Sequence, residues 1–550
     1  MPSHFLQEDP KALAHILEDT SREMIEQQAA AKARSLHVPY INLHGFPIDL
    51  NVLALFSKDM AERAGGFPFF KEGRDLRVAA IDPQNPLLLE QLKILSKKYK
   101  STIYLVSEMS FHQTLVFYSK IVTPQATYHE QVIVENPPPI PELRKKVIAE
   151  SAAAGTTATS LMADLFALAY GLEASDIHLE PGADKTSARL RIDGVLQPVV
   201  EIDKPIAKSL VTRIKMLSKL KLNVSNQPQD GRLTFLYDNK PIDVRVSILP
   251  AAGGEGVVLR LLGVGAQSLN ISELGLRGRA LEVVTRALHK PNGMMITTGP
   301  TGSGKTTTLY SFLMELNKPG VKIITLEDPV EYKLVGIQQT PIDHTVDFNF
   351  ANALRSVLRQ DPDIVMVGEI RDQETAETAL QAALTGHVVL STLHTNDASG
   401  AVPRLITMDI KPFVIAPAIN AIIAQRLVRK LCQACKKEAK PSAAILKSVE
   451  KIVAAIPANS NEAAPKKLTF YHSEGCDACH NLGYKGRIGI YEVIEITDPI
   501  RDLILKEGAS HEIRQLAVKD GMLSLLQDGI LKALEGITDV EEVFRVAGES

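Results

Sequence analysis

One segment of this 550-residue chain restricts its fold more than any other. An apolar stretch, Met294–Thr298, leads directly into a glycine-rich loop, and a helical pattern follows from Thr307 to Leu316. The loop and its end read Gly299-Pro300-Thr301-Gly302-Ser303-Gly304-Lys305-Thr306, the complete G-x-x-x-x-G-K-T pattern in the strand–loop–helix context that a phosphate-binding loop (P-loop) requires. Glycines let backbone N–H groups turn inward around phosphate oxygens, and the helix N-terminus adds positive potential. A chance match in a turn is the weaker interpretation, because the flanking strand and helix are both present.

The P-loop pattern predicts an ATP and Mg²⁺ site. Lys305 is expected to reach the β- and γ-phosphates, and Thr306 is expected to hold Mg²⁺. The expected nucleotide-binding residues are Gly299, Pro300, Thr301, Gly302, Ser303, Gly304, Lys305, Thr306 and Thr307.

Between about 270 and 430, short and nearly continuous apolar strands alternate with helical patterns. Such strands are buried on both faces, which indicates a parallel sheet covered by helices. The expected strands are Met294–Thr298, Lys322–Leu326, Ile364–Val367 and Val388–Leu393. The P-loop therefore belongs to an α/β domain.

Two of these strands end in acids, Glu327 after the second and Glu369 after the third. In a parallel sheet such ends open onto the nucleotide crevice, where one acid can activate water and another can hold the metal. The alternative is that these acids are solvated and only cap the next helix. Two strands that both end in an acid after a P-loop disfavour this alternative. His394 ends the Val388–Leu393 strand at the same edge, which predicts a γ-phosphate contact. His387 is expected at the opposite end.

The chain is long enough for three or four domains. Pro137–Pro141 is expected to be a semi-rigid spacer that marks the clearest boundary, and Ala439–Lys467 is expected to be a loose insertion. We predict an N-terminal domain over 1–135, a Pro-rich linker over 136–150, a smaller α+β domain over 151–265, the ATPase core over 270–430, a cysteine module over 431–490 and a helical region over 491–550. Within the smaller domain we expect a basic helix, Val211–Leu222, and then a turn, Gln227–Arg232.

All four cysteines lie in two C-x-x-C pairs, Cys432 with Cys435 and Cys476 with Cys479. This spacing is typical of tetrahedral Zn²⁺ sites, and a disulfide scaffold would spread its cysteines more widely. The long separation between the pairs does not exclude one shared metal, because each doubling of a flexible loop costs only about 0.6 kcal/mol. We therefore expect a closed structural zinc site in which His480, although adjacent, has no place.

Composition excludes several other classes. The net charge of -3 disfavours strong binding of polyanions by the whole chain. The N-terminus has no secretory-signal pattern, and no apolar run approaches the roughly 18 residues that span a bilayer. The longest candidate, Pro412–Ala424, contains Asn420 and is better explained as a buried helix. The expected location is therefore cytoplasmic, without membrane insertion.

Several motifs together resemble the secretion ATPases that drive type IV pilus assembly and type II secretion, over about residues 150 to 500. Besides the P-loop, they are Ser175-Asp176-Ile177-His178-Leu179-Glu180, Arg191-Ile192-Asp193-Gly194, Gln229-Asp230-Gly231-Arg232, Thr325–Glu331, Val367–Asp372, and Thr385-Gly386-His387 through Asn396-Asp397. The order of these motifs carries the resemblance.

The resemblance implies a RecA-like P-loop domain preceded by a smaller α+β (PAS-like) domain, with an N-terminal α/β domain and a zinc-binding C-terminal insertion. It implies a homo-hexameric ring, peripheral at the inner membrane, that acts through a platform protein and an adaptor. Glu327 would polarise the attacking water, and Glu369 would hold Mg²⁺ through water. Arg213 and Arg232 would reach the γ-phosphate, with a solvated basic face as their alternative. Tetracysteine modules occur in assembly and secretion members.

The N-terminal part departs from the family pattern. Assembly ATPases often carry a cyclic-di-GMP module with repeated Arg-Leu-Gly-x-x-Leu segments, and residues 1 to 135 contain none. Residues 33–40, Ala-Arg-Ser-Leu-His-Val-Pro-Tyr, nevertheless indicate that the domain is present.

Two functions remain open besides the leading one, a motor for a pilus or a secretion pseudopilus. A nucleic-acid translocase also uses RecA-like rings, and it could use the basic residues Arg426, Arg429, Lys430, Lys436 and Lys437. The absence of Trp and the 5% of aromatic residues disfavour a base-stacking channel. A non-catalytic nucleotide-gated scaffold is disfavoured by intact Lys305, Glu327 and Glu369.

Overall fold

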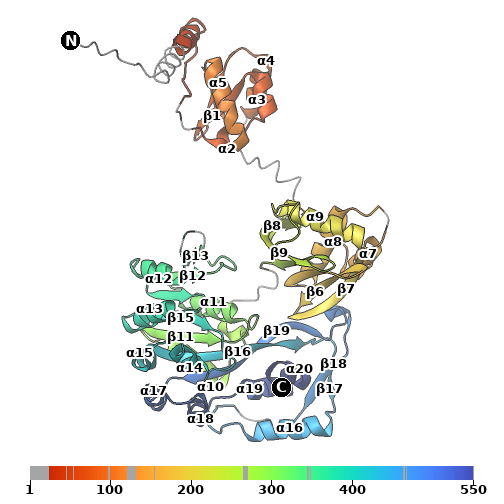
Figure 1. The fold of residues 1–550 in the computed structure, drawn as a ribbon, viewed down its shortest axis with the longest axis vertical. Helices are drawn as coiled ribbons and strands as arrows, with labels where there is room; N and C mark the ends of the chain where they lie inside the picture. The colour runs from red at the N-terminus through yellow and green to blue at the C-terminus, as the bar shows by residue number, and fades with distance from the viewer. Residues whose placement is uncertain are drawn as a thin grey trace, which may run out of the picture. The chain divides into compact units, whose positions relative to one another are not determined.

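The computed structural model describes residues 24–548, apart from 45, 47, 54, 97–98, 121–131, 154, 264–269, 344–345, 347, 463–464 and 466. The chain divides into two compact units, residues 1–131 and 132–550 (Figure 1). Within the described residues, no helix is both long enough and apolar enough to cross a bilayer.

The first unit is a small α/β domain, as the sequence predicted. Its three-stranded sheet has the order β1-β2-β3, with β1 antiparallel and β3 parallel to β2. Buried Phe67, Phe69 and Leu76 lie in its core. Its elements are a helix over 24–35, α2 (Leu50–Leu53), α3 (Lys58–Ala64), β1 (Gly66–Glu72), β2 (Asp75–Ala80), α4 (Pro86–Leu95), β3 (Lys100–Leu105), α5 (Glu108–Leu115) and the 3-10 helix η1 (Val116–Lys120).

The second unit begins with a seven-stranded sheet of order β4-β8-β9-β10-β5-β6-β7. Buried Phe166 on α8 stacks on Phe235 of β8 with ring centroids 4.7 Å apart, and Ile214 on α9 joins the same core. The elements are β4 (Val132–Val134), α7 (Ile140–Glu150), α8 (Ala158–Gly171), β5 (Asp176–Pro181), β6 (Lys185–Ile192), β7 (Val195–Asp203), α9 (Lys204–Leu217), β8 (Gln229–Tyr237), β9 (Lys240–Ala251) and β10 (Gly254–Leu261).

Three local expectations for this region were wrong. The proline-rich segment was expected to be a spacer, but α7 begins at Ile140 with Pro141 in its first turn. A proline there is tolerated because the first N–H groups of a helix have no intrahelical partner, and Leu143 and Val147 bury the helix against the core. The basic helix begins at Lys204 and ends at Leu217, and the last four residues of the expected turn, Gln229–Arg232, form the start of β8 instead.

A second seven-stranded sheet has the order β13-β12-β14-β15-β11-β16-β19. All pairs are parallel except β16 with β19, and each predicted strand is present within one residue of its expected bounds. The elements are η2 (Ile271–Glu273), α10 (Gly278–Leu288), β11 (Gly293–Thr298), α11 (Lys305–Leu316), β12 (Ile323–Glu327), β13 (Gln338–Pro341), α12 (Phe350–Leu358), β14 (Ile364–Val367), α13 (Gln373–Leu384), β15 (Val388–Leu393), α14 (Ala401–Ile406), α15 (Pro412–Ala418), β16 (Ile419–Leu431) and β19 (Tyr484–Glu495).

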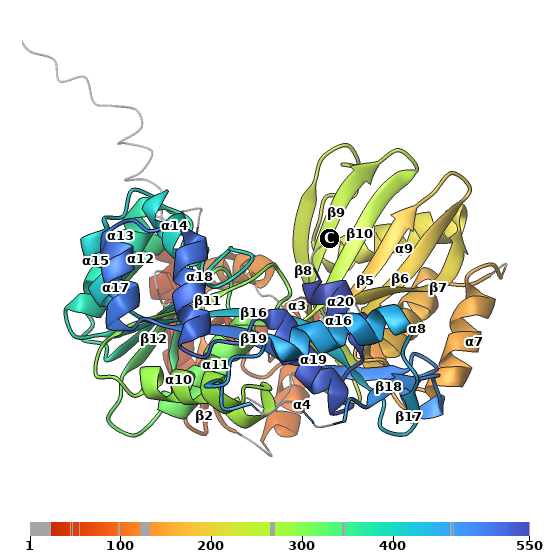
Figure 2. The same ribbon diagram turned by 90° about the horizontal axis from the view of Figure 1, so that it is seen from below.

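Helices cover both faces of this sheet and produce two separate hydrophobic cores. One core includes Phe350, Leu380 and Ile415 from α12, α13 and α15. The other includes Val284 of α10 and Leu309 of α11. Figure 2 shows α12, α13 and α15 on one side of β11 and β12, with α10 and α11 on the other. The predicted parallel sheet covered by helices is confirmed.

The buried helix expected over Pro412–Ala424 is only half present. Helix α15 ends at Ala418, and β16 continues from Ile419 to Leu431. Ile422 and Ile423 of β16 face the two opposite cores of the sheet and are fully buried. Because both faces of this strand are apolar, its sequence has no period-two alternation, and periodicity could not separate it from a buried helix.

The segment after β16 is folded, so the expectation of a loose insertion over Ala439–Lys467 was wrong. Strands β17 (Lys436–Ala439) and β18 (Phe470–Ser473) pair antiparallel, and η4 (Asp477–Cys479) follows. Helix α16 (Ala443–Ala454) packs through buried Val449 against the C-terminal helices. The predicted helical tail is confirmed as α17 (Asp498–Leu505), α18 (Ser510–Lys519), α19 (Leu525–Leu534) and α20 (Val540–Ala547).

Candidate active site and metal centre

The P-loop joins the end of β11 to the start of α11, as predicted. Gly299, Gly302 and Gly304 have φ values of 146°, 79° and 88°. A Cβ atom on Gly299 would lie 2.6 Å from the carbonyl oxygen of Gln425 and 2.7 Å from Ser303 Oγ, so this position has no room for a side chain. The backbone can therefore fold back on itself and direct its N–H groups toward one point at the helix N-terminus.

Lys305 lies across this loop. Its Nζ donates to the carbonyl oxygens of Gly299 at 2.9 Å and Pro300 at 3.1 Å. Burial lowers the pKa of Lys305 from its usual value, and the nearby Glu369 carboxylate opposes that shift. Thr301 and Thr306 are exposed at the loop surface. The ammonium and the Thr306 hydroxyl are thus both available to a phosphate and its metal.

Gln425 supports the loop from β16, and sequence reasoning missed it. This side chain is buried, and its Nε2 donates to the Ser303 carbonyl oxygen at 2.7 Å. Residues Thr298 and Ala424 are register partners on β11 and β16, so Gln425 follows directly beside the loop. Only the parallel pairing of these strands, which local sequence does not encode, places it there.

Glu369 follows β14 and lies near two other predicted site residues, Lys305 and His394. Its Oε2 is 3.3 Å from Nε2 of His394, and its Oε1 is paired with Arg371 at 2.5 Å. The Lys305 ammonium is close enough for its pKa to respond to the carboxylate. The structure thus brings Lys305, Glu369 and His394 together at one edge of the sheet. His387 lies at the opposite end, as expected, where its carbonyl oxygen accepts from the Gly293 N–H at the start of β11.

Glu327 ends β12 and is only 3% exposed. Its Oε2 accepts a hydrogen bond from the Tyr310 hydroxyl, and its Oε1 accepts from Thr325 Oγ1 at 2.5 Å and from Gln339 Nε2 at 3.1 Å. The three donors come from α11, β12 and β13. Sequence reasoning identified the acid but none of the groups that hold it.

The two arginines that were expected at the phosphate lie on the smaller sheet and its helix. Arg213 is half-buried on α9, and Arg232 is exposed on β8 opposite Arg245 of β9. Arg245, which the sequence analysis did not select, reaches the loop after β12. It donates to the Val330 carbonyl oxygen at 3.1 Å and lies 3.5 Å from Glu331.

The four cysteines form one cluster, with all Sγ atoms within 4.8 Å of one another. The separations are 3.9 Å between Cys432 and Cys476, 3.8 Å between Cys435 and Cys479, and 3.8 Å between Cys476 and Cys479. A tetrahedral Zn²⁺ with Zn–S bonds of about 2.3 Å requires sulfur atoms about 3.8 Å apart. The long separation between the two C-x-x-C pairs is occupied by a folded segment, in which β17 and β18 pair and α16 lies between them in the sequence.

Backbone amides favour the thiolate of Cys479, whereas burial and the neighbouring thiols raise the pKa of Cys435 to about 11. The N–H groups of Cys476 and Gly483 donate to Cys479 Sγ at 3.2 and 3.3 Å. Burial raises the pKa of the Cys479 thiol, but these amides and the neighbouring thiols outweigh it and bring the pKa to about 7. The donor set and its spacing therefore fit a soft, tetrahedral cation.

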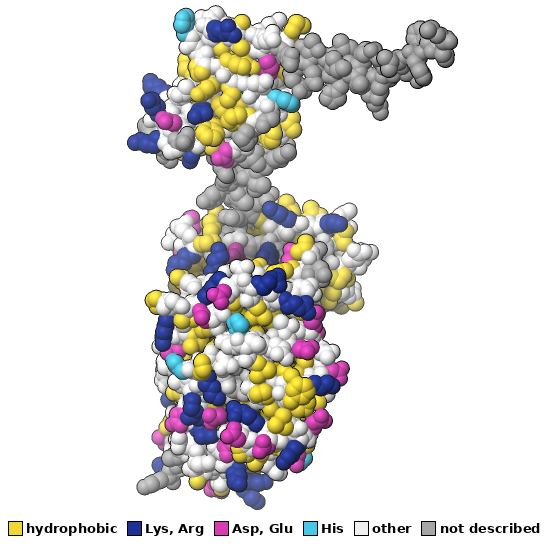
Figure 3. Space-filling view, turned by 90° about the vertical axis from the view of Figure 1, so that its left-hand side faces the viewer, with side chains coloured by type: hydrophobic (Ala, Val, Ile, Leu, Met, Phe, Trp, Pro, Cys, Tyr) yellow, Lys and Arg dark blue, Asp and Glu magenta, His cyan; other side chains and the backbone are white. Residues whose placement is uncertain are grey.

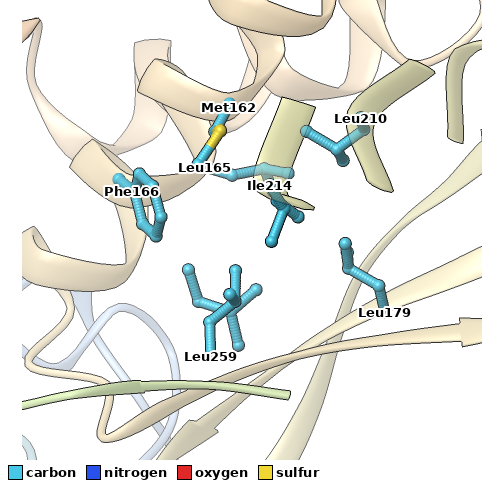
Figure 4. Close-up of a pocket in the computed structure, with 8 residues that line it drawn as sticks. Met162, Leu165, Phe166, Leu179, Leu210, Ile214 and Leu259 are labelled. Carbon is cyan, nitrogen blue, oxygen red and sulfur yellow. The ribbon is translucent and has the colours of Figure 1, made fainter. Parts of the chain in front are cut away.

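A cavity in the smaller domain carries no site. It measures about 10 Å³ and is lined only by apolar side chains, including Met162, Phe166 and Leu259 (Figure 4). A water needs roughly 10–15 Å³ together with polar partners. The cavity is a packing gap between α8, α9 and the sheet.

Comparison with known proteins gives matches over both units. The model of the family described as "Type II/IV secretion system protein" matches residues 153–545, and that of the "MshEN domain" matches residues 36–116. The type IV pilus assembly ATPase PilB of Myxococcus xanthus is 39% identical over 514 residues, which cover 92% of this chain and 88% of the relative. Type II secretion system protein E of Pseudomonas aeruginosa is 48% identical over 68% of this chain and 72% of its own length.

A solved structure supports the fold alone. The ATPase DotB of Legionella pneumophila is 22% identical and has a TM-score of 0.51, with 72% of this chain and 97% of DotB covered.

Proposed function

Because this chain belongs to the Type II/IV secretion system protein family and is an ATPase of that family, we propose that it is a hexameric motor for the assembly of a type IV pilus or a type II secretion pseudopilus. The observation that carries this proposal is the meeting of Lys305, Glu369 and His394 at one sheet edge, in a chain that matches a pilus assembly ATPase over 92% of its length. The proposed partners are an inner-membrane platform protein and an adaptor.

We propose roles in ATP hydrolysis for five of the predicted site residues. Lys305 would contact the β- and γ-phosphates, Thr306 would hold Mg²⁺, Glu369 would hold Mg²⁺ through water, and His394 would contact the γ-phosphate. Glu327 polarises the attacking water. The exposed Thr306 and the closeness of Lys305, Glu369 and His394 support this distribution.

The nucleic-acid translocase alternative loses support from the basic residues on which it rested. Arg429 forms an ion pair with Glu542 at 2.8 Å, Lys437 pairs with Glu474 at 2.7 Å, and Lys436 donates to the Gly536 carbonyl oxygen. On the face shown in Figure 3, acidic and basic side chains are interspersed. Phosphate binding along a strand requires a continuous basic groove, which these internal pairs disfavour.

We expect ATP turnover of the purified protein to require Mg²⁺ and to rise when the cytoplasmic part of the platform protein is added, but not when DNA is added. Turnover measured by phosphate release, with each addition at matched ionic strength, checks this. Strong stimulation by DNA together with no response to the platform protein would favour the translocase.

We propose that Cys432, Cys435, Cys476 and Cys479 hold one structural Zn²⁺. Replacement of Cys435 or Cys476 by Ser is expected to remove about one zinc per chain and to loosen residues 430–490, because metal affinity is local folding energy in such a small module. ATP binding is expected to persist, since the P-loop uses none of these residues. Elemental analysis and hydrogen exchange measure the two effects.

The matched control is His480→Ala, next to the tetrad, which is expected to retain zinc. Absence of stoichiometric zinc from the unaltered protein after reducing purification would contradict the assignment.

A further inference from the structure

The buried setting of Glu327 gives a role to side chains that no motif identifies. Its carboxylate is paired with no cation among the described residues, and it receives hydrogen bonds from the Tyr310 hydroxyl, Thr325 and Gln339 instead. A buried carboxylate is costly unless hydrogen bonds satisfy it, and these donors determine the direction in which it points. We propose that Tyr310 is a positioning residue that orients Glu327 for water activation, with Gln339 as its second support. This inference rests on the proposed catalytic role of Glu327.

Tyr310 is fixed in place independently of the carboxylate. Its side chain is 0% exposed in the core between α11 and the sheet. Its ring packs edge-on against Tyr332, with centroids 4.8 Å apart and an interplanar angle of 84°. Burial raises the pKa of the Tyr310 hydroxyl, so the group stays protonated and remains a donor. The carboxylate must therefore align with the hydroxyl, rather than the hydroxyl with the carboxylate.

The position of Tyr310 in the sequence links two parts of the site. It lies on α11, five residues after Lys305, so one rigid helix carries both the phosphate-binding lysine and the donor to Glu327. Gln339 adds a connection to β13: its Nε2 lies 3.3 Å from the Tyr310 oxygen, and its Oε1 accepts from the Leu334 N–H at 2.7 Å. The distance between the phosphates and the base is thus set by α11 and the sheet, which do not depend on a mobile loop.

Tyr310→Phe removes the hydroxyl and keeps the ring, so the core stays filled. We expect kcat to fall about tenfold or more while KM for ATP changes little, because a charge-assisted hydrogen bond to the base is lost and no phosphate contact changes.

Tyr332→Phe is the matched control. This substitution removes only the hydroxyl of the neighbouring ring. Tyr332 takes part in the network through its backbone carbonyl oxygen, which accepts a hydrogen bond from Gln339 Nε2 and is unchanged in the variant. We expect its kcat and its KM for ATP to remain those of the unaltered protein.

A double variant separates positioning from a general structural effect. If Tyr310 acts only through Glu327, adding Tyr310→Phe to Glu327→Gln should cause no further loss of turnover. A Tyr310→Phe protein with unchanged kcat, beside an inactive Glu327→Gln protein, would overturn this inference and leave the proposed function intact. Normal turnover in Glu327→Gln itself would instead remove the catalytic role on which the inference rests.

Discussion

Glu327→Gln is expected to leave ATP bound and to reduce hydrolysis by about 10²–10⁴-fold, the usual contribution of a positioned general base. The substitution keeps the shape of a side chain that is 3% exposed, and the Tyr310 hydroxyl can turn to accept from the new amide. The amide cannot take a proton from water, so only the chemical step is removed. Single-turnover hydrolysis and fluorescent-nucleotide binding measure the two quantities separately.

Lys305→Ala is the comparison variant, because it changes the phosphate site instead of the base. Its ammonium lies over the loop at 2.9 and 3.1 Å from two carbonyl oxygens, where phosphate oxygens would replace them. We expect this variant to lose ATP affinity and turnover together. Undiminished turnover in Glu327→Gln, or tight ATP binding without Lys305, would contradict the assigned roles.

The second large effect concerns the arginines of the smaller domain. If Arg213 and Arg232 complete the site when the domains close around ATP, alanine at either position should reduce turnover by about 10³-fold with little change in ATP affinity. The reason is that an arginine acts on charge that develops only in the transition state. Steady-state turnover and ATP binding of each variant test this, and two fully active variants would return both residues to a solvated basic face.

Arg245→Ala is an informative comparison for that experiment. Arg245 contacts Val330 and Glu331 in the described structure, three to four residues beyond Glu327. If Arg245→Ala alone loses turnover, then Arg245, and not Arg213 or Arg232, is the arginine that stabilises the transition-state charge.

The parts of the site that could be predicted from sequence are those set by local pattern. The P-loop glycines and the acids Glu327 and Glu369 stand at fixed offsets from apolar strands, and the strands of the parallel sheet were correctly placed. Strand order puts their carboxyl ends together, which is why His394 was also predicted at the Glu369 edge and found there.

The residues that were missed depend on pairing between distant strands. Gln425 and Gln339 reach the site because β16 pairs with β11 and β13 pairs with β12, and neither register can be read from a local window. Arg245 lies on β9, and nothing in its flanking sequence indicates Val330 as a partner. The wrong assignments have a similar origin: an apolar run suits a buried helix or a buried strand, and an Ala-rich segment forms α16 only because Val449 has a core to enter.

Strand β16 connects the phosphate loop to the cysteine module. It runs without interruption from the side of the P-loop, where Gln425 holds the Ser303 carbonyl oxygen, to Leu431, and Cys432 of the tetrad follows directly. Cys432 lies seven positions after Gln425, about 23 Å along extended backbone at roughly 3.3 Å per residue. Antiparallel pairing with β19 stiffens most of that length. One continuous strand therefore joins the support of the phosphate loop to the first cysteine of the tetrad, so the two sites share a single covalent connection.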